Sequence, residues 1–384
     1  MAQLAPYASQ ADASRGRKLP EPEADNRSAF QRDRDRIIHS NAFRRLKHKT
    51  QVFVFHEGDY FRTRLTHSIE VAQIARTVVR SLGANEDLAE AVALAHDLGH
   101  TPFGHAGEDA LSAALRDVGG FDHNVQTLRV LTRLEKRYAA FDGLNLTWET
   151  LEGVVKHNGP LADPPEAIAD YDAEHPLWLD SHAGLEAQVA ALADDIAYNS
   201  HDIDDGLRAG LFTLEEVGAL DLIGPLLAEI DAAWPGLERQ RRIYELVRQL
   251  IGLMVRDLTA ETRARLDRLQ PASADDVRRA AAPVAAFSDD LLGRLNGLRS
   301  FLKAHMYRHT HVNRMTSKAR RIVTDLFTLL SNEPESLPDE WRTAAAGLDS
   351  VRVKRVVGDY IAGMTDRYAM LEHQRLFDIY SRNL

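Results

Sequence analysis

The sequence predicts an all-α fold. Apolar residues recur at helical spacing along most of the 384-residue chain. No series of segments alternates apolar and polar residues in the way that the strands of a sheet do. Proline marks breaks between helical segments at 235–236, 270–271 and 333–334. A chain of this length buries a large core, either as one domain or as two domains that are tightly joined.

Composition argues against several classes of protein. The formal net charge is -10 at pH 7, which opposes a role of the whole chain on nucleic acid or a membrane surface. The chain has no cysteine, so disulfides, thiolate metal sites and cysteine nucleophiles are excluded. No run of about 18 apolar residues is present, so we expect no membrane-spanning helix. The first residues lack an apolar signal segment, and we expect a cytoplasmic protein.

Three regions are expected along the chain. Residues 1–26 read as a flexible tail that is partly ordered, residues 27–210 as the functional core, and residues 211–384 as a C-terminal helical region. Within the core, residues 27–49 are locally basic and follow helical spacing. Two interpretations of this segment stay open. It is either an amphipathic helix with a solvated basic face or a wall that faces phosphate groups.

The core begins with one expected strand and one expected helix. Residues 51–55 are typical of a short strand, and turn-forming residues follow them. Thr66 is expected to cap the next helix, which Gly83 ends. This arrangement places His67 in the first turn of that helix.

Residues 95–108 concentrate the polar side chains. A helix over 86–95 leads into this segment, and Gly99, Pro102, Gly104 and Gly107 interrupt helix within it. Buried imidazoles and carboxylates need partners, and so many together most simply share a metal ion and a proton-transfer task. The candidates are His96 and Asp97 at the helix end, and His100, His105 and Glu108 on a loop.

The rest of the chain reads as helices around one long irregular segment. Residues 158–182 hold most of the irregular sequence, which suits a lid or a pocket wall. Helices are expected at 108–118, 124–135, 148–157, 184–207, 214–231, 238–266, 274–306, 313–331, 338–346 and 350–379.

Four residues on three of these helices predict a metal centre. A divalent ion needs about four nitrogen or oxygen ligands from the protein. The candidates are His67, His96, Asp97 and an acid within 193–195. Taken singly, each of these residues is more readily explained by a structural role than as a metal ligand. Taken together, they favour a metal site. These ligand types admit manganese, nickel, iron, zinc or magnesium.

Five segments of the sequence resemble the dGTP triphosphohydrolase family of the HD-domain phosphohydrolases. They are 62–67 (RTRLTH), 96–105 (HDLGHTPFGH), 120–124 (GFDHN), 156–160 (KHNGP) and 193–198 (ADDIAY). The resemblance is close over 30–205 and looser beyond it. It implies an HD-domain helical core at 27–210, with the C-terminal region completing a substrate pocket and an oligomer interface.

The resemblance also implies roles for single residues. It places the last metal ligand four residues before a tyrosine that contacts substrate, which selects Asp194 over Asp195. The substrate-binding residues that it implies are Gln51, Arg64, His100, Tyr198, Asp202, Arg299, Lys303 and Tyr307. The last three fall at i, i+4 and i+8, and as sequence alone they fit a solvated helix face equally well.

The implied reaction is metal-dependent hydrolysis of a deoxynucleoside triphosphate, dGTP or several dNTPs, at the α-phosphate. Its products are a deoxynucleoside and triphosphate. A histidine suits protonation of the leaving oxygen. His105 is the first choice because Glu108, three residues on, would orient it, and His123 is the second. Alternatively, one or two of these histidines only hold the loop by hydrogen bonds.

Partners and rival functions follow from the family and from charge. Members of the family form hexamers or tetramers and often need a dNTP activator at a separate site, so a homo-oligomer is expected. The chain could instead act on another nucleotide as an HD phosphohydrolase. It could also be a nucleotide-sensing or single-stranded nucleic-acid-binding protein, because 27–49 and 303–321 are basic.

Overall fold

The computed structural model describes residues 4–22, 26–51 and 62–380 and confirms the all-α prediction. Within these ranges no strand forms, and only isolated β-bridges pair extended residues. The α-helices are α1 (Ala29–Ile38), α2 (Asn41–Arg45), α3 (Arg64–Leu82), α4 (Glu86–Ala95), α5 (His105–Ala114), α6 (His123–Arg129), α7 (Trp148–Val155), α8 (Glu166–Glu174), α9 (Leu185–Arg208), α10 (Leu214–Gly218), α11 (Gly224–Ala233), α12 (Arg239–Leu269), α13 (Ala274–Arg278), α14 (Asp289–Leu302), α15 (Thr310–Asn332), α16 (Asp339–Ala345), α17 (Ser350–Ala362) and α18 (Asp366–Phe377). Short 3₁₀ turns lie at Ala11–Ala13, Leu46–His48, Arg116–Val118 and Pro334–Ser336, and π turns at Val130–Leu134 and Lys303–Tyr307.

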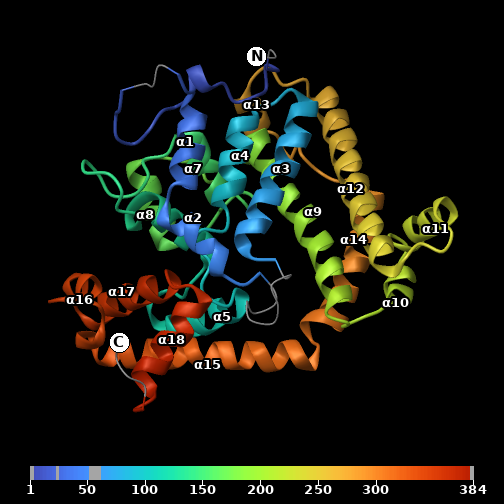
Figure 1. Cartoon of the computed structure of the whole chain (residues 1–384). Helices are drawn as coiled ribbons and strands as arrows, with labels where there is room; N and C mark the ends of the chain where they lie inside the picture. The colour runs from blue at the N-terminus through green and yellow to red at the C-terminus, as the bar shows by residue number, and fades with distance from the viewer. Residues whose placement is uncertain (1–3, 23–25, 52–61, 381–384) are drawn as a thin grey trace.

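Helices α3, α4 and α9 pack together at the centre of the main hydrophobic core (Figure 1). Asn85 caps α4, because its side chain accepts from the backbone N–H of Leu88. Nearly every residue of α4 is buried, and its alanines allow neighbouring helices to approach closely. A Cβ at Gly153 of α7 would lie 2.9 Å from Val92 and 2.8 Å from Ala187, so glycine permits this contact between three helices. The candidate metal ligands therefore lie on, or directly after, the helices at the centre of the main hydrophobic core.

A second hydrophobic cluster joins α5 to the C-terminal helices α15, α17 and α18. In Figure 1, α15 runs along the base of the molecule with α5 directly above it. Conversely, α12 and α14 pack on α9 and belong to the main core. The packing thus runs across the boundary that the sequence predicts at residue 210, and it places α5 between the two halves of the chain.

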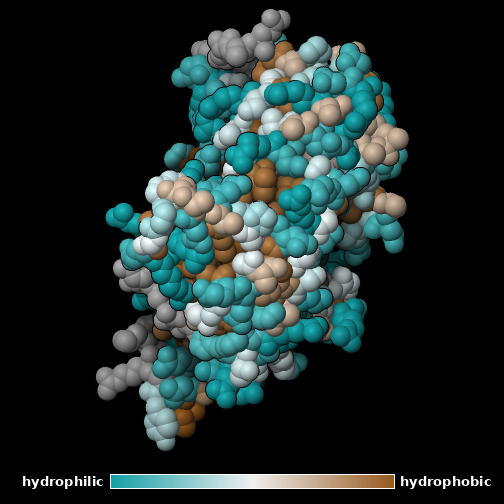
Figure 2. Space-filling model, turned by 90° about the vertical axis from the view of Figure 1, so that its right-hand side faces the viewer, coloured by the Kyte–Doolittle hydropathy of each residue, from teal (hydrophilic) through white to brown (hydrophobic). Residues whose placement is uncertain are grey.

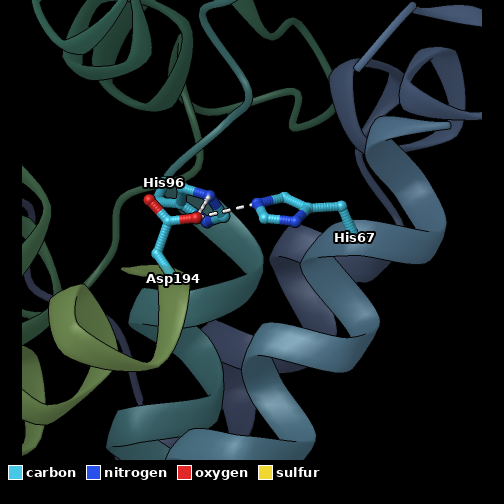
Figure 3. Close-up of side chains that lie close together, drawn as sticks. All are labelled: His67, His96 and Asp194. Carbon is cyan, nitrogen blue, oxygen red and sulfur yellow. Dashed lines mark hydrogen bonds and ion pairs between the residues drawn. The ribbon is translucent and has the colours of Figure 1, made fainter. Parts of the chain in front are cut away.

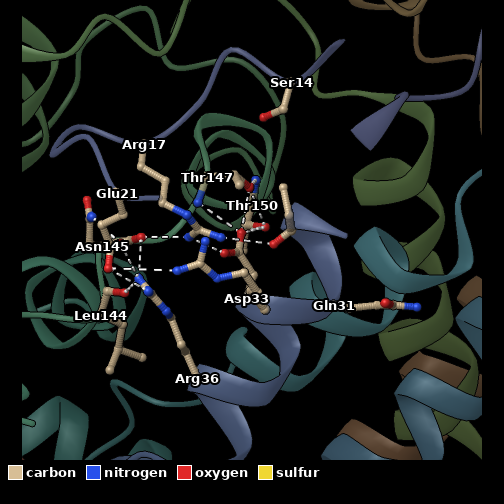
Figure 4. A network of polar contacts seen from close by, with 12 residues as sticks. Ser14, Arg17, Glu21, Gln31, Asp33, Arg36, Leu144, Asn145, Thr147 and Thr150 are labelled. Carbon is tan, nitrogen blue, oxygen red and sulfur yellow. Dashed lines mark hydrogen bonds and ion pairs between the residues drawn. The ribbon is translucent and has the colours of Figure 1, made fainter. Parts of the chain in front are cut away.

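Residues 4–22 of the expected tail are ordered against the core. The backbone N–H and hydroxyl of Ser9 donate to Glu186 of α9 at 2.9 and 3.0 Å. Arg17 pairs at 2.5 Å with Asp33 of α1, a fully buried carboxylate that also accepts from Thr147 and Thr150 (Figure 4). These partners lie on α1, on α9 and next to α7, and not beside the tail in the sequence, which is why local sequence did not reveal its order.

The basic segment 27–49 is not simply a solvated face. Arg36 is buried, pairs with Glu21 at 2.8 Å and donates to the carbonyl oxygens of residues 144 and 145 (Figure 4). Lys49 is buried as well. Part of the positive charge is therefore neutralised inside the fold, and the phosphate-facing interpretation stays a prediction.

Several predicted boundaries are wrong for local reasons. The third helix begins at Arg64 with Thr63 as its cap residue, and the Thr66 hydroxyl instead donates to the Thr63 carbonyl. The helix expected from residue 108 begins at His105, so His105 and Glu108 are helical rather than on a loop. The helices expected at 214–231, 274–306 and 350–379 each divide in two, and α8 lies inside the segment expected to be irregular. Gly363 follows α17, and Pro283 lies in the break after α13. The strand expected at 51–55 lies outside the described residues apart from Gln51.

The surface and the helices bear on the expectation that no helix spans a membrane. The face in Figure 2 is mainly hydrophilic, with hydrophobic residues showing in small groups. No helix of residues 4–22, 26–51 and 62–380 combines the length and the apolar character that crossing a membrane requires.

Candidate active site

Three helices bring His67, His96 and Asp194 to one point (Figure 3). His67 lies in the first turn of α3, His96 follows the last residue of α4, and Asp194 lies on α9. One oxygen of Asp194, Oδ1, lies 2.8 Å from Nε2 of His67 and 3.6 Å from Nε2 of His96. One ligand atom from each residue falls within 4.8 Å of the other two. The three residues therefore offer two nitrogens and an oxygen to a single small ion.

The ring of His96 is oriented for a cation. Its Nδ1 lies 2.7 Å from the carbonyl oxygen of Ala93, and because a carbonyl only accepts, this nitrogen carries the proton. The lone pair is then on Nε2, which is buried and has no hydrogen-bond donor among the described residues. Burial lowers the pKa of His96, which keeps the ring neutral. A buried lone pair without a donor is costly, and it fits a divalent metal ion.

Asp97 borders this group. Its Oδ1 lies 3.3 Å from Nε2 of His96, and its Oδ2 accepts from Arg64 at 2.9 Å. Burial acts to raise the pKa of Asp97, but the charge of Arg64 holds it well below the usual value. Burial also acts to raise the pKa of Asp194, which the electrostatic interaction with the His96 ring and hydrogen bonds from His157 and His67 hold well below that value. Both carboxylates are therefore ionised and able to attract a cation.

His157 is a site residue that the sequence did not single out. Its Nε2 lies 3.4 Å from Oδ2 of Asp194, and its ring stacks on His96 with centroids 5.5 Å apart. His157 follows α7 and lies within KHNGP, one of the segments that carry the family resemblance. Nothing in its spacing separated it from a structural histidine, so only its membership of that segment could have drawn attention to it.

Glu108 joins two of the candidate histidines. Its Oε1 accepts from Nδ1 of His123 at 2.8 Å, and its Oε2 lies 3.1 Å from Nδ1 of His105. His105 is the first residue of α5 and its side chain is 64% exposed, whereas that of His123 is 22% exposed. Burial acts to lower the pKa of His123, but the hydrogen bond and charge of Glu108 raise it overall. Burial acts to raise the pKa of Glu108, and the two histidines hold it far below its usual value.

His100 connects this pair to the metal group. The rings of His100 and His123 stack with centroids 3.9 Å apart, and Nε2 of His100 lies 3.2 Å from Oδ1 of Asp97. Burial lowers the pKa of His100 well below its usual value, so the ring is neutral. Gly99 makes this packing possible, because a Cβ there would lie 2.2 Å from the carbonyl oxygen of His123. Seven of the predicted residues thus form one continuous polar cluster: His67, His96, Asp97, Asp194, His100, Glu108 and His123.

A second group forms around Asp202, two turns along α9 from Asp194. The hydroxyl of Tyr307 contacts a carboxylate oxygen of Asp202 and lies 2.5 Å from the hydroxyl of Tyr198. Burial raises the pKa of Asp202 well above its usual value, and its Oδ1 has no partner among the described residues. As their i, i+4 and i+8 spacing predicts, Asp194, Tyr198 and Asp202 lie on one face of α9. Gln51 is buried, and its Oε1 also lacks a described partner.

The face predicted for Arg299, Lys303 and Tyr307 is not a regular α-helical one. Helix α14 ends at residue 302, and a π turn carries the chain from Lys303 to Tyr307. Arg299 pairs with Asp195 at 3.0 Å, and Tyr307 reaches Asp202. Lys303 is exposed and is not brought together with the other candidates. The wider turn changes the direction of these side chains, which the i, i+4, i+8 spacing did not anticipate.

Comparison with known proteins identifies the family. Residues 64–199 match the HD domain, and residues 285–375 match the phosphohydrolase-associated domain. A deoxyguanosinetriphosphate triphosphohydrolase-like protein of Parvibaculum lavamentivorans is 59% identical over 386 residues, which cover 99% of this chain and 98% of that protein. Relatives of the same name from Azorhizobium caulinodans and Cereibacter sphaeroides are 58% and 56% identical, over 95% and 97% of this chain and 94% and 99% of theirs. The chain belongs to the deoxyguanosinetriphosphate triphosphohydrolase-like family.

Membership of this family makes the chain a hydrolase of the HD type. HD domains bind divalent metal, and the cluster of His67, His96 and Asp194 lies within the matched residues. The phosphohydrolase-associated match begins just before α14 and includes Tyr307, so both matched regions contribute to the polar residues described above. The recognition from sequence is confirmed at the level of the family.

Proposed function

We propose that the enzyme hydrolyses a deoxynucleoside triphosphate at the α-phosphate and releases a deoxynucleoside and triphosphate. The observation that carries this proposal is the continuous cluster from the buried His96 nitrogen, through Asp97 and His100, to the pair of Glu108 and His123. A metal site and a proton-transfer site lie side by side in it. The names of the relatives point to dGTP as substrate. We keep several dNTPs as the broader alternative.

We assign the metal ligands to His67, His96, Asp97 and Asp194. The neutral ring of His96 and the two ionised carboxylates match the oxygen and nitrogen ligands of manganese, nickel, iron, zinc or magnesium. Bound by these residues, a divalent ion would supply Lewis-acid polarisation to a water molecule at the phosphorus. Arg64 keeps Asp97 ionised and turned towards His96. Arg64 is also buried beside Gly104, in the loop before α5. We therefore assign it as the cation that binds a phosphate group of the substrate.

We assign protonation of the leaving 5′-oxygen to His105. Glu108 faces Nδ1 of His105 and accepts the hydrogen bond from its N–H, so the imidazolium form presents Nε2–H to the leaving oxygen, donates that proton and is left as the neutral ring. The exposure of His105 allows contact with an entering nucleotide, whereas His123 lies deeper and shares the same carboxylate. His123 is the second choice for the acid. His100, between the two groups, is assigned to an α-phosphate oxygen.

The deoxyribose is assigned to the group around Asp202. Gln51, Tyr198, Asp202 and Tyr307 provide hydrogen-bonding atoms and aromatic surface, and two of these atoms are buried without a described partner. A buried acceptor of this kind discriminates strongly for a substrate hydroxyl. Tyr198 packed below the sugar would leave little room for a 2′-hydroxyl. Arg299 and Lys303 remain candidates for the terminal phosphates.

One experiment tests the reaction. The purified protein is loaded with Mn²⁺ and incubated with each dNTP alone and with all four mixed, and nucleoside and triphosphate are resolved by chromatography. We expect equimolar deoxynucleoside and triphosphate. Release of phosphate or pyrophosphate instead would contradict cleavage at the α-phosphate and would favour another HD phosphohydrolase reaction.

The same assay addresses the activator and the assembly. We propose a homo-oligomer, a hexamer or tetramer, in which a second dNTP at a separate site raises activity. Faster turnover in the mixture than in the sum of single substrates would support the activator. A monomer by light scattering under assay conditions would contradict the assembly. Weak binding of single-stranded nucleic acid would appear as salt-dependent retention of a labelled oligonucleotide.

A further inference from the structure

The second ring nitrogen of His67 points away from Asp194 towards another histidine. Nδ1 of His67 lies 3.3 Å from Nδ1 of His201, and both side chains are almost fully buried. The rings meet edge to face, with centroids 5.3 Å apart. His201 is on α9, two turns beyond Asp194, so α9 contacts both nitrogens of the His67 ring.

The far side of His201 faces a carboxylate. Its Nε2 contacts Oε2 of Glu70, which lies on α3 one turn after His67. Glu70 is partly exposed, but this oxygen is shielded from solvent. Arg62 approaches the same oxygen at 3.4 Å and is itself held by Asp204 and Asp205 at 2.9 and 3.1 Å. A line of contacts therefore runs from His67 to a carboxylate at the protein surface.

The order of protons along this line follows from the atoms that face one another. A carboxylate oxygen only accepts, so Nε2 of His201 carries a proton. If Nδ1 of His201 holds the lone pair, it accepts from Nδ1–H of His67, and the lone pair of His67 is then on Nε2. That is the atom which faces Asp194. Without an ion a proton on Nε2 donates to this carboxylate, and with an ion bound between the two residues Nε2 would need its lone pair. The opposite order would place a proton on Nε2 of His67, where a metal ligand needs a lone pair.

We infer that His201 and Glu70 are positioning residues that hold His67 in the form required of a metal ligand. Metal-bound histidines usually donate their other N–H to a carboxylate or carbonyl, and such partners raise the basicity of the ligand. Here a second histidine stands between the ligand and the carboxylate. The inference rests on the proposed role of His67 as a ligand, and it adds a function for two residues that take no part in the proposed reaction.

The test is a titration of the metal-free protein with Mn²⁺ alone, followed by calorimetry, so that activity plays no part in the readout. His201→Leu removes both nitrogens, while His201→Gln restores one acceptor and one donor. We expect His201→Leu to bind Mn²⁺ about 10- to 100-fold more weakly than the unaltered protein, and His201→Gln to recover a measurable part of that loss. Glu70→Ala, at a partly exposed position that tolerates truncation, should also weaken binding.

The control is Ser200→Ala, on the same turn of α9. Ser200 is buried and its hydroxyl donates to the carbonyl of residue 196, so this variant perturbs the helix without touching His67. It should bind Mn²⁺ as the unaltered protein does. Thermal melting of each metal-free variant separates a loss of metal affinity from a loss of fold.

Each possible result either supports or contradicts the positioning role of His201 and Glu70. Unchanged affinity in His201→Leu, or equal loss in His201→Leu and His201→Gln, would show that the ring contributes only packing and would overturn the inference. If His201→Leu fails to fold, unchanged affinity in Glu70→Ala overturns it, and a loss there with a preserved melting temperature supports it. An unaltered protein that binds no Mn²⁺ would instead refute the proposed ligand set, a distinguishable failure.

Discussion

His96 and His105 are nine residues apart, yet the structure gives them different surroundings. His96 is buried beside Asp194, with a nitrogen that has no hydrogen-bond partner among the described residues, and His105 is exposed beside Glu108. We expect His96→Ala to lose bound metal and activity together. His105→Ala should keep metal and lose turnover by about 10²- to 10⁴-fold, the usual contribution of a general acid. Metal content by mass spectrometry and the chromatographic assay measure the two quantities. Near-full turnover of His105→Ala would move the acid to His123.

The pair of Glu108 and His123 makes stability depend on pH. The pKa of His123 is raised above its ordinary 6.5, so its contribution to the free energy of unfolding is complete below that value and is lost as pH rises through the raised pKa. The pKa of Glu108 is lowered from 4.5, so its contribution is present above 4.5 and is lost as pH falls further. The pair therefore stabilises the fold most fully between these two ordinary values.

The variant Glu108→Gln tests this dependence, because it removes the charge and keeps the size. Its melting temperature should fall most, relative to the unaltered protein, at about pH 5.5, and the difference should be smaller at about pH 9, because His123 loses its proton as pH rises through its raised pKa. Asp109→Asn, the neighbouring acid on the same helix, is the control. Equal destabilisation by Glu108→Gln at both pH values would show that shape, not charge, is what the pair contributes.

At the scale of helices, the sequence pattern was sufficient to predict a helix where contacts within one segment determine its structure. The periodicity between Thr66 and Gly83 predicted α3 apart from its first residues, and that of 86–95 predicted α4. The spacing of Asp194 and Asp202 predicted a shared face of α9. The sequence pattern was not sufficient where packing against distant segments determines the structure. The π turn at 303–307 gives no periodic signal, and His157 enters the site only because α7 packs on α4. The position of Asp33 inside a network of distant partners was equally hidden.

That network gives a prediction for α1. Asp33 is fully buried and accepts from Arg17, Thr147 and Thr150, so Asp33→Ala leaves a buried guanidinium and two hydroxyls without their partner. We expect a loss of about 3–5 kcal/mol in the free energy of unfolding, measured by urea denaturation. Asp35→Ala on the same helix breaks partly exposed pairs with Arg27 and Arg34, and should cost about 1 kcal/mol or less. Equal losses for the two variants would mean that the network does not anchor residues 4–22.

At the scale of the molecule, the loop that carries His100 is held by the C-terminal helices. Lys49 is buried and donates to the carbonyl oxygens of His100 and Ala362, the last residue of α17. Asp366, the first residue of α18, accepts from the backbone N–H of Thr50 at 2.9 Å and of Phe103 at 2.8 Å. The helices that match the phosphohydrolase-associated domain therefore fix a loop of the HD domain. This explains why α5 and the C-terminal helices share a hydrophobic cluster.

Asp366 is the residue at which this coupling is tested. Asp366→Ala removes the acceptor of two backbone N–H groups, so the segment from His100 to Phe103 should exchange its amide hydrogens faster. Because His100 contacts Asp97 and His123, turnover should fall, whereas Mn²⁺ affinity should change less, since His67, His96 and Asp194 come from other elements. His373→Ala, on α18 like Asp366, breaks the partly exposed pair with Asp325 of α15 and should leave turnover unchanged. If Asp366→Ala shows faster exchange at the loop but unchanged turnover, the reaction does not depend on the position of His100. That result would contradict the assignment of His100 to the substrate site.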